Sequence, residues 1–191
     1  MLVYLIRHGQ TEWNLQGRYL GLTDLPLCEL GVKNAQSTKA PDAELIFTSP
    51  LLRCRQTADI LFPGKKKTVL QDLRECDFGH FEGRNADEME RDCEYRRWVS
   101  SGCTEDIPGG ESIDGFHSRC CSAMENAIRD NKNASSIAFV AHGGVIMSLL
   151  HHFNTERHAF YDYNIENCAV IACECRPDGE LSLTVIGGNC L

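Results

Sequence analysis

Two histidines in this chain stand in the same setting. His8 comes just after the apolar run 2–6, His142 directly follows the apolar run 137–141, and glycine follows both histidines. Short continuous apolar runs are typical of strands that are buried on both faces of a parallel sheet. Ligands of open α/β sheets bind at the carboxyl ends of such strands. We therefore expect both imidazoles at the edge of a sheet where chemistry takes place.

The residue types around these histidines suit phosphoryl transfer. A neutral imidazole can attack phosphorus and form a phosphohistidine, so His8 is the candidate nucleophile. Arg7 and Arg53 carry guanidinium groups, which bind phosphate oxygens bidentately and stay charged at working pH. His142 opens a predicted helix, where Gly143 lets backbone N–H groups approach an anion closely. The pattern predicts that the two arginines, His142 and the Gly143 N–H bind the phosphoryl group while it is transferred to His8.

Phosphate transfer also needs an acid that protonates the leaving group and then activates water. A carboxylic acid can do both if its pKa is raised enough to hold a proton at neutral pH. Glu75, in the loop-like segment 73–83, is the first candidate, and Glu82 in the same segment is the second. The predicted catalytic set is therefore His8, Glu75, His142, Arg7 and Arg53.

The charge balance limits the partners of the chain. It carries 19 Lys and Arg against 27 Asp and Glu, a formal net charge of −8. Such a surface on average repels nucleic acid and anionic membranes, so an anionic substrate needs local positive charge. No apolar run approaches the ~20 residues of a membrane helix. We expect a small-molecule phosphomonoester as the substrate, with neither nucleic acid nor membrane as a partner, and leave a homodimer open.

The eleven cysteines bear on the compartment. Their number is odd, and the N-terminus lacks the charged and apolar regions of a signal peptide. This combination favours reduced thiols in the cytoplasm over a set of disulfides. We expect most of the cysteines to serve as small buried hydrophobic residues.

Strands alternate with helices along the chain, which indicates an α/β sandwich in one domain, residues 1–191. Ser49 is a candidate N-cap of one helix, with Pro50 at its first position. Predicted helices span 30–39, 51–61, 87–99, 112–130 and 145–152. Besides the two runs before the histidines, predicted strands span 45–47 and 68–70, and a hairpin is predicted from 168–174 and 181–186.

Several short motifs follow one another along the chain. The segment at 7–14 reads Arg-His-Gly-Gln-Thr-Glu-Trp-Asn, and further motifs lie at 17–18, 24–27, 30–31, 49–58, 73–75, 78–79, 81–83, 108–112 and 141–144. Taken in this order, they resemble the motifs of the histidine phosphatase superfamily, the phosphoglycerate mutase-like proteins. The resemblance implies a phosphoglycerate mutase-like fold, a three-layer α/β/α sandwich on a mostly parallel sheet, that needs no metal and no cofactor.

The resemblance also implies roles for individual residues. His8 would be the phosphorylated histidine and Glu75 the proton donor. The phosphate pocket would be formed by Arg7, Asn14, Arg53 and His142. All six residues are present, which argues against a catalytically inactive relative.

The same resemblance makes residues 85–117 a partly helical cap over the site. Within it, Arg96, Arg97 and Trp98 could contact the organic part of a substrate. The favoured interpretation is nevertheless a helix with an ordinary charged face and one buried tryptophan. Leu20 and Cys28 depart from residues common in the family, and both are expected in the loop that lines the pocket mouth.

Chain length favours a phosphatase over a mutase. Mutases of this family are typically longer, with an inserted segment and a tail that shield the phosphoenzyme from water. Within the phosphatases, segments 77–79, 81–83, 108–112 and 142–146 look most like α-ribazole-5'-phosphate phosphatases of cobalamin synthesis. Broad-specificity phosphatases share much of this pattern, and a cofactor-dependent phosphoglycerate mutase is a further alternative. A non-enzymatic phospho-ligand binding module is disfavoured because His8 and Glu75 are both present.

Overall fold

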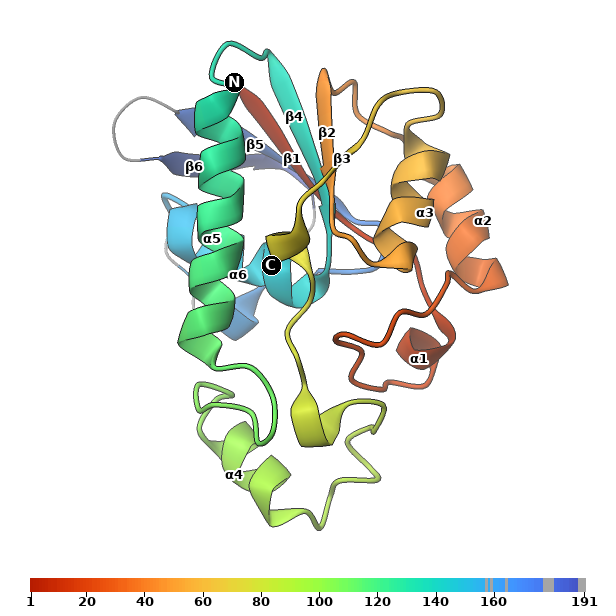
Figure 1. Cartoon of the computed structure of the whole chain (residues 1–191), viewed down its shortest axis with the longest axis vertical. Coiled ribbons are helices and arrows are strands. Elements are labelled where there is room, and N and C mark those ends of the chain that lie inside the picture. Colours follow the sequence, from red (N-terminus) through yellow and green to blue (C-terminus); the bar gives the residue numbers. More distant parts are fainter. Residues whose placement is uncertain (157, 159, 164, 177–180, 189–191) are drawn as a thin grey trace.

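The computed structural model of the chain describes residues 1–156, 158, 160–163, 165–176 and 181–188. A sheet of six strands forms its centre, in the order β3-β2-β4-β1-β5-β6 (Figure 1). The four strands from β3 to β1 run parallel to one another. At the other edge, β5 pairs antiparallel with β1, and β6 pairs antiparallel with β5. The strands are β1 (Leu2–Arg7), β2 (Leu45–Thr48), β3 (Thr68–Val69), β4 (Ser136–Ala141), β5 (Val170–Arg176) and β6 (Ser182–Gly187).

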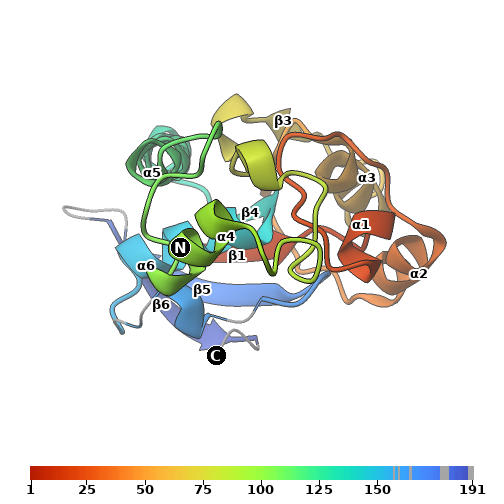
Figure 2. The same cartoon turned by 90° about the horizontal axis from the view of Figure 1, so that it is seen from below.

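Helices cover both faces of the sheet, which makes a three-layer sandwich (Figures 1 and 2). The helices α2 (Glu29–Ser37) and α3 (Leu52–Leu61) lie on one face. The helices α5 (Ile113–Asp130) and α6 (Gly143–Phe153) lie on the other. The mostly parallel α/β/α architecture predicted from the sequence is therefore confirmed.

The remaining helical segments lie mainly around the carboxyl ends of the parallel strands. In the view from below, the short α4 (Cys93–Ser100) lies in front of β1 and β4 (Figure 2). The other short helical segments are α1 (Glu12–Leu15), η1 (Gln71–Leu73), η2 (Gly79–Phe81) and η3 (Phe160–Asp162).

Side-chain alternation along the central strands supplies both layers of the core. In β1, Val3 and Leu5 belong to the core under α5 and α6, whereas Ile6 belongs to the core under α3. In β4, Phe139 faces the first core and Val140 the second. Because successive strand side chains point to opposite faces, a strand covered on both sides must be apolar at nearly every position. This explains the continuous apolar runs before the two histidines.

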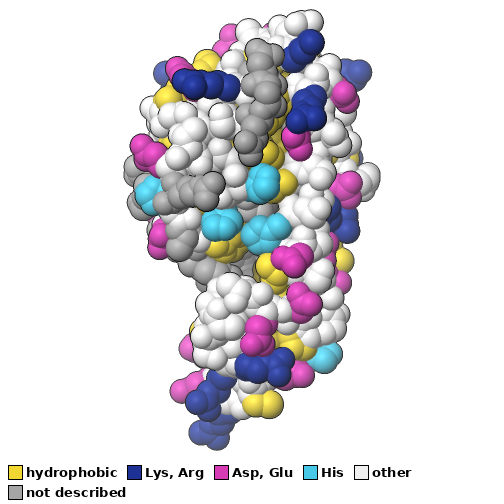
Figure 3. All heavy atoms as spheres, turned by 90° about the vertical axis from the view of Figure 1, so that its left-hand side faces the viewer, with side chains coloured by type: hydrophobic (Ala, Val, Ile, Leu, Met, Phe, Trp, Pro, Cys, Tyr) yellow, Lys and Arg dark blue, Asp and Glu magenta, His cyan; other side chains and the backbone are white. Residues whose placement is uncertain are grey.

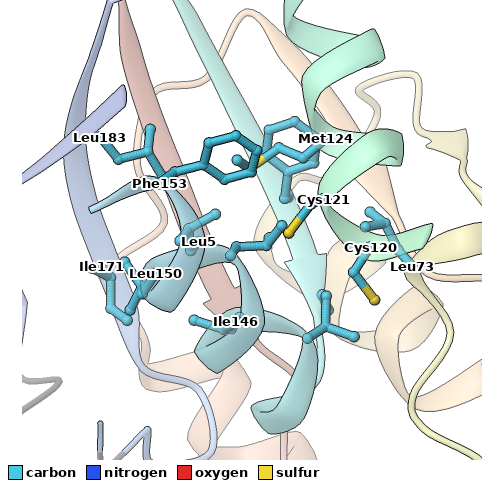
Figure 4. Packing of buried hydrophobic residues seen from close by; sticks show 14 of the residues in the cluster. Leu5, Leu73, Cys120, Cys121, Met124, Ile146, Leu150, Phe153, Ile171 and Leu183 are labelled. Carbon is cyan, nitrogen blue, oxygen red and sulfur yellow. The ribbon is translucent and has the colours of Figure 1, made fainter. Parts of the chain in front are cut away.

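The larger core lies between the sheet and the helices α5 and α6. Leu5, Ile171 and Leu183 from three neighbouring strands face Ile146 and other side chains of these helices (Figure 4). The thiols of α5 lie in the same layer as its Met124. No disulfide joins two of the described cysteines, and all but Cys93 and Cys103 are buried, so the expectation of small buried hydrophobic residues is confirmed for most of them.

Two local predictions need correction. Ser49 is not the side-chain cap of α3: the N-cap is Leu51, without a side-chain cap hydrogen bond. The Ser49 hydroxyl instead lies 2.7 Å from His142 Nε2, and Asp24 Oδ1 accepts from the Leu52 N–H at 2.6 Å. The helix predicted over 87–99 begins only at Cys93, because the carboxylate of Asp92 caps it by accepting from the N–H groups of Glu94 and Tyr95.

The other predicted helices agree with the structure within a few residues. The hairpin is also confirmed, since β5 and β6 pair antiparallel. Its turn, 177–180, lies outside the described residues. No helix among the described residues is both long and apolar enough to cross a membrane.

The first turn of α2 carries an unusual cap that can be improved. Cys28 is the N-cap, and its Sγ accepts from the Gly31 N–H at 3.4 Å. A hydroxyl oxygen is a better acceptor than sulfur, so Cys28→Ser is expected to raise the free energy of unfolding by about 0.5–1 kcal/mol. Urea denaturation measures this change. A Cys28→Ser variant less stable than Cys28→Ala would contradict the capping role.

Candidate active site

A cavity of about 280 Å³ lies at the carboxyl ends of β1 and β4. Five of the seven residues predicted for the site line it. These are Arg7, His8, Asn14, Glu75 and Gly143. The other two, Arg53 and His142, are fully buried behind it and contact each other. The structure therefore brings together all the residues that the sequence predicted for the site.

His8 is held in one tautomer. Its Nδ1 lies 2.7 Å from the carbonyl oxygen of Gly9, so Nδ1 carries the proton and donates it to this oxygen. The Nε2 lone pair is then available for attack, and Nε2 has no hydrogen-bond partner among the described residues. Burial holds the pKa of His8 well below its usual range, and the charges of Arg53 and Arg7 act in the same direction. His8 is therefore a neutral, oriented imidazole at neutral pH.

His142 lies beside His8, with ring centroids 5.2 Å apart. Arg53 Nε donates to His142 Nδ1 at 3.2 Å, so the ring proton sits on Nε2 and is donated to Ser49 Oγ. Burial, followed by the charge of Arg53, holds the pKa of His142 well below its usual range. His142 thus also stays neutral, and it links Arg53 to the nucleophile.

The guanidinium of Arg53 fixes the loop that follows α1. It donates to the carbonyl oxygens of Gly21 at 2.7 Å and Thr23 at 2.9 Å. Glu82 holds the same loop from the other side, because its carboxylate accepts from the N–H groups of Gly21 and Thr23. Glu82 is thus used as a loop anchor and does not line the cavity, which favours Glu75 over Glu82 as the acid.

Arg7 leaves one donor without a partner at the cavity. Its Nη1 donates to the carbonyl oxygen of Ile165, whereas its Nε is buried and has no acceptor among the described residues. A buried donor without an acceptor is costly, and a charged one especially so. A phosphate oxygen in the cavity would satisfy it. Asn14 has a related arrangement, since its Oδ1 accepts from Thr11 and leaves the amide NH₂ free to donate.

The carboxyl group of Glu75 is buried and contacts the first turn of α6. Its Oε1 accepts from the Cys76 N–H at 3.0 Å and its Oε2 from the Gly144 N–H at 3.1 Å. Burial raises the pKa of Glu75 above its usual value, although these hydrogen bonds and Arg53 oppose the rise. A Cβ at position 144 would lie 2.6 Å from Glu75 Oε1, so glycine is needed there for the close approach.

Sequence reasoning missed several residues of the site. Arg18 and Tyr19 line the cavity, although Arg18 Nη1 and Nη2 are already paired with the carboxylate of Glu88 at 2.7–2.8 Å. Arg18 lies within a matched motif, which was the available signal. Leu20 lines the cavity as expected, but Cys28 does not, because its thiol caps α2 instead.

Arg119 of α5 is another missed residue, and it fixes the segment that carries Glu75. Its guanidinium donates to the carbonyl oxygens of Asp72, Arg74 and Glu75 at 2.7, 2.7 and 3.0 Å. The carboxylate of Glu111 accepts from it at 2.6 and 2.7 Å. No local sequence signal connects these positions. Their relation arises only when α5 packs beside the 72–75 segment.

Loss of this arginine should therefore affect both stability and rate. Arg119→Leu leaves several acceptors unpaired, so we expect the free energy of unfolding to fall by about 2–4 kcal/mol. We also expect kcat to fall by about 10- to 100-fold, because the carboxyl group of Glu75 is no longer held in place. Arg129→Leu on the same helix is the control, since Arg129 is exposed and pairs with Glu125 within α5. Equal effects of the two substitutions would contradict the positioning role.

The pKa shifts of His8 and Glu75 predict the pH profile of kcat/KM. His8 must be neutral to attack, and its pKa lies below 6.5, so the acid limb should fall well below pH 6.5. Glu75 must be protonated, and its pKa lies above 4.5, so activity should decline as pH rises past that raised value. Stopped assays with an alkyl phosphomonoester measure the profile. A declining limb that persists in Glu75→Gln would contradict the assignment of this limb to Glu75.

Among the described residues, no three His, Cys, Asp or Glu side chains are grouped so that they could hold a metal ion. The site described above consists of imidazoles, guanidinium groups, a carboxyl group and backbone amides. This set can bind a phosphate and supply both a nucleophile and a proton.

Comparisons with known proteins agree with this site. A sequence model of the histidine phosphatase superfamily (branch 1) matches residues 3–186. A relative from Cronobacter sakazakii named "Probable phosphoglycerate mutase GpmB" is 35% identical over 179 residues, which is 88% of this chain and 82% of the relative.

Solved structures share the fold. The α-ribazole phosphatase from Shigella flexneri superposes with a TM-score of 0.84 at 22% identity, covering 97% of this chain and 96% of that one. The phosphoserine phosphatase from Entamoeba histolytica, solved with 3-phosphoglyceric acid, gives a TM-score of 0.82 at 26% identity, covering 98% and 96%. With the matched family and the assembled site, the chain belongs to the histidine phosphatase superfamily (branch 1) and is an enzyme of the phosphatase class.

Proposed function

We propose that the chain hydrolyses phosphomonoesters through a phosphohistidine at His8. In the first step, His8 Nε2 attacks phosphorus and the ester P–O bond breaks. The protonated Glu75 gives its proton to the departing oxygen. In the second step, Glu75 takes a proton from water, the water oxygen bonds to phosphorus, and the P–N bond breaks to release inorganic phosphate and restore His8.

One observation carries this proposal. His8 Nε2, without a partner, and the orphaned Nε of Arg7 line the same cavity as the buried carboxyl group of Glu75. Nucleophile, anion-binding donor and acid therefore converge on a volume of about 280 Å³. The arginines Arg7 and Arg53 would stabilise the charge of the transferring group, and the Gly143 N–H at the start of α6 would add a donor.

The physiological substrate is proposed more finely as α-ribazole-5'-phosphate, which places the enzyme in cobalamin synthesis. The motifs at 77–83 and 108–112 support this, together with the fold shared with the Shigella flexneri enzyme. Residues 85–117 would act as the cap that selects the organic group. A broad-specificity phosphatase is the alternative. A panel of α-ribazole phosphate, sugar phosphates and nucleotides, ranked by kcat/KM, tests the choice, and a flat ranking would favour broad specificity.

The mutase alternative is favoured by the name of the Cronobacter sakazakii relative. Incubation with 3-phosphoglycerate and its bisphosphate primer separates the two functions. Hydrolysis predicts inorganic phosphate as the main product. Faster formation of 2-phosphoglycerate would instead support the mutase. Full activity in excess chelator is also expected, because the proposed steps use no metal.

We further propose a cytoplasmic enzyme that acts on a small molecule, without nucleic acid or membrane partners. The lack of a disulfide among the described cysteines and the net charge of −8 support this. Self-association as a homodimer is tested by light scattering of the purified protein.

A further inference from the structure

A second cavity of about 290 Å³ adjoins the phosphate site. Five residues line both cavities, so the two volumes are direct neighbours. They are Tyr19, Glu75, Phe78, Gly144 and Met147. A phosphate bound between His8 and Arg7 would therefore have this second cavity beside it, past the acid Glu75. This is the direction in which a leaving group protonated by Glu75 would lie.

The walls of the second cavity are mainly aromatic and aliphatic. Tyr19 packs against Phe78 with ring centroids 5.1 Å apart and against Trp98 at 5.8 Å. Ile107, from the segment before α5, and Phe116, from α5 itself, also line the cavity. Trp98 and Phe116 are buried, so packing against their neighbours holds these walls in place.

The second cavity also lacks permanent positive charge among the described residues. Glu75, shared with the phosphate site, is its one acidic residue, and no lysine or arginine lines it. The arginines Arg96 and Arg97 of α4 line a separate hollow with Asp87 and Glu90 instead. Trp98 is buried, as the favoured sequence interpretation of α4 expected, but it lines the second cavity and therefore stays a candidate contact of the organic group.

Two histidines also line the second cavity. His117 of α5 and His151 of α6 have ring centroids 6.4 Å apart. Figure 3 shows several histidine side chains gathered on one face of the molecule. Burial, together with His151 and His152, lowers the pKa of His117 from its usual value. His117 is therefore uncharged at neutral pH and does not replace a missing cation.

We propose that this second cavity binds the organic part of the substrate and selects phosphomonoesters with an uncharged aromatic or apolar group. Esters that carry a carboxylate or a second phosphate near the scissile bond are rejected. The inference rests on the proposed phosphatase function and adds the class of leaving group to it. A carboxylate in this cavity would be desolvated without a cationic partner, next to the carboxyl group of Glu75.

The test compares alkyl esters whose alcohols have similar leaving-group ability. We expect kcat/KM for 2-phenylethyl phosphate to exceed that for glycerol phosphate by about 10- to 100-fold, the value of burying one phenyl group. 3-Phosphoglycerate should be a still poorer substrate. Equal values for the three esters would overturn the inference and leave the proposed function standing. Hydrolysis of none of them, nor of p-nitrophenyl phosphate, would instead overturn the proposed function.

Charge variants test the lining directly. Met147→Lys places a cation where the two cavities meet and should shift the ratio of kcat/KM values toward 3-phosphoglycerate by at least about 10-fold. Thr104→Lys at the exposed rim should shift it in the same direction without disturbing the core. Val99→Lys is the matched control, because Val99 is exposed on α4 and lines only the separate hollow. The same ratio in all three variants would contradict the proposal.

Discussion

His8→Ala is expected to reduce phosphatase turnover by at least about 10⁴-fold, because the variant has no nucleophile to carry the phosphoryl group. The neighbouring groups Arg7, Arg53 and Glu75 remain, so substrate should still bind. Single-turnover assays with p-nitrophenyl phosphate measure the loss. Equilibrium binding of inorganic phosphate tests that the pocket survives.

His152→Ala is the matched control for the nucleophile. His152 is an exposed histidine of α6 that lines neither cavity, so its loss should leave turnover within about twofold. Undiminished turnover by the His8→Ala protein would contradict the covalent mechanism. An inactive protein that no longer binds phosphate would show that His8 serves the pocket and would not establish it as nucleophile.

Glu75→Gln should produce a loss that depends on the leaving group. The amide side chain keeps the size of the carboxyl group but cannot donate the proton, so kcat/KM for an alkyl phosphomonoester should fall by about 10²–10⁴-fold. p-Nitrophenolate leaves without protonation, so kcat/KM for its ester should fall by less than about 10-fold. The value of kcat should fall for both esters, because water still needs Glu75 as its base.

Glu82→Gln provides the comparison for this prediction. Glu82 anchors the loop at Gly21 and Thr23 and does not line the cavity. Its loss should lower kcat/KM for both esters by the same factor. The same leaving-group dependence in Glu82→Gln and Glu75→Gln would contradict Glu75 as the acid.

The sequence predicts the site well because its parts follow strand ends. The apolar runs before His8 and His142 are short and continuous, and parallel strands bring their carboxyl ends to one edge. The motif resemblance adds Asn14 and strengthens Arg53 and Glu75. Each of these residues lies in a local pattern that a single sequence can display.

Contacts between distant segments cannot be predicted from this sequence alone. Ser49 has the local pattern of a helix cap, but its hydroxyl lies against His142, 93 positions away. Arg119 donates to carbonyl oxygens 44 to 47 positions earlier in the chain. Every residue has a backbone carbonyl, so the residue types do not indicate which ones accept. The aromatic cavity likewise depends on how Tyr19 meets Trp98 in the folded chain. Tertiary packing decides these features.

A rapid-quench experiment with a radiolabelled phosphomonoester tests the covalent step most directly. The proposed mechanism predicts a phosphoryl adduct on the peptide that contains His8, labile to acid and stable to base, which forms and decays at least as fast as turnover. Such an adduct should be absent from His8→Ala. Active protein that turns over substrate with no label at His8 would contradict the phosphohistidine mechanism.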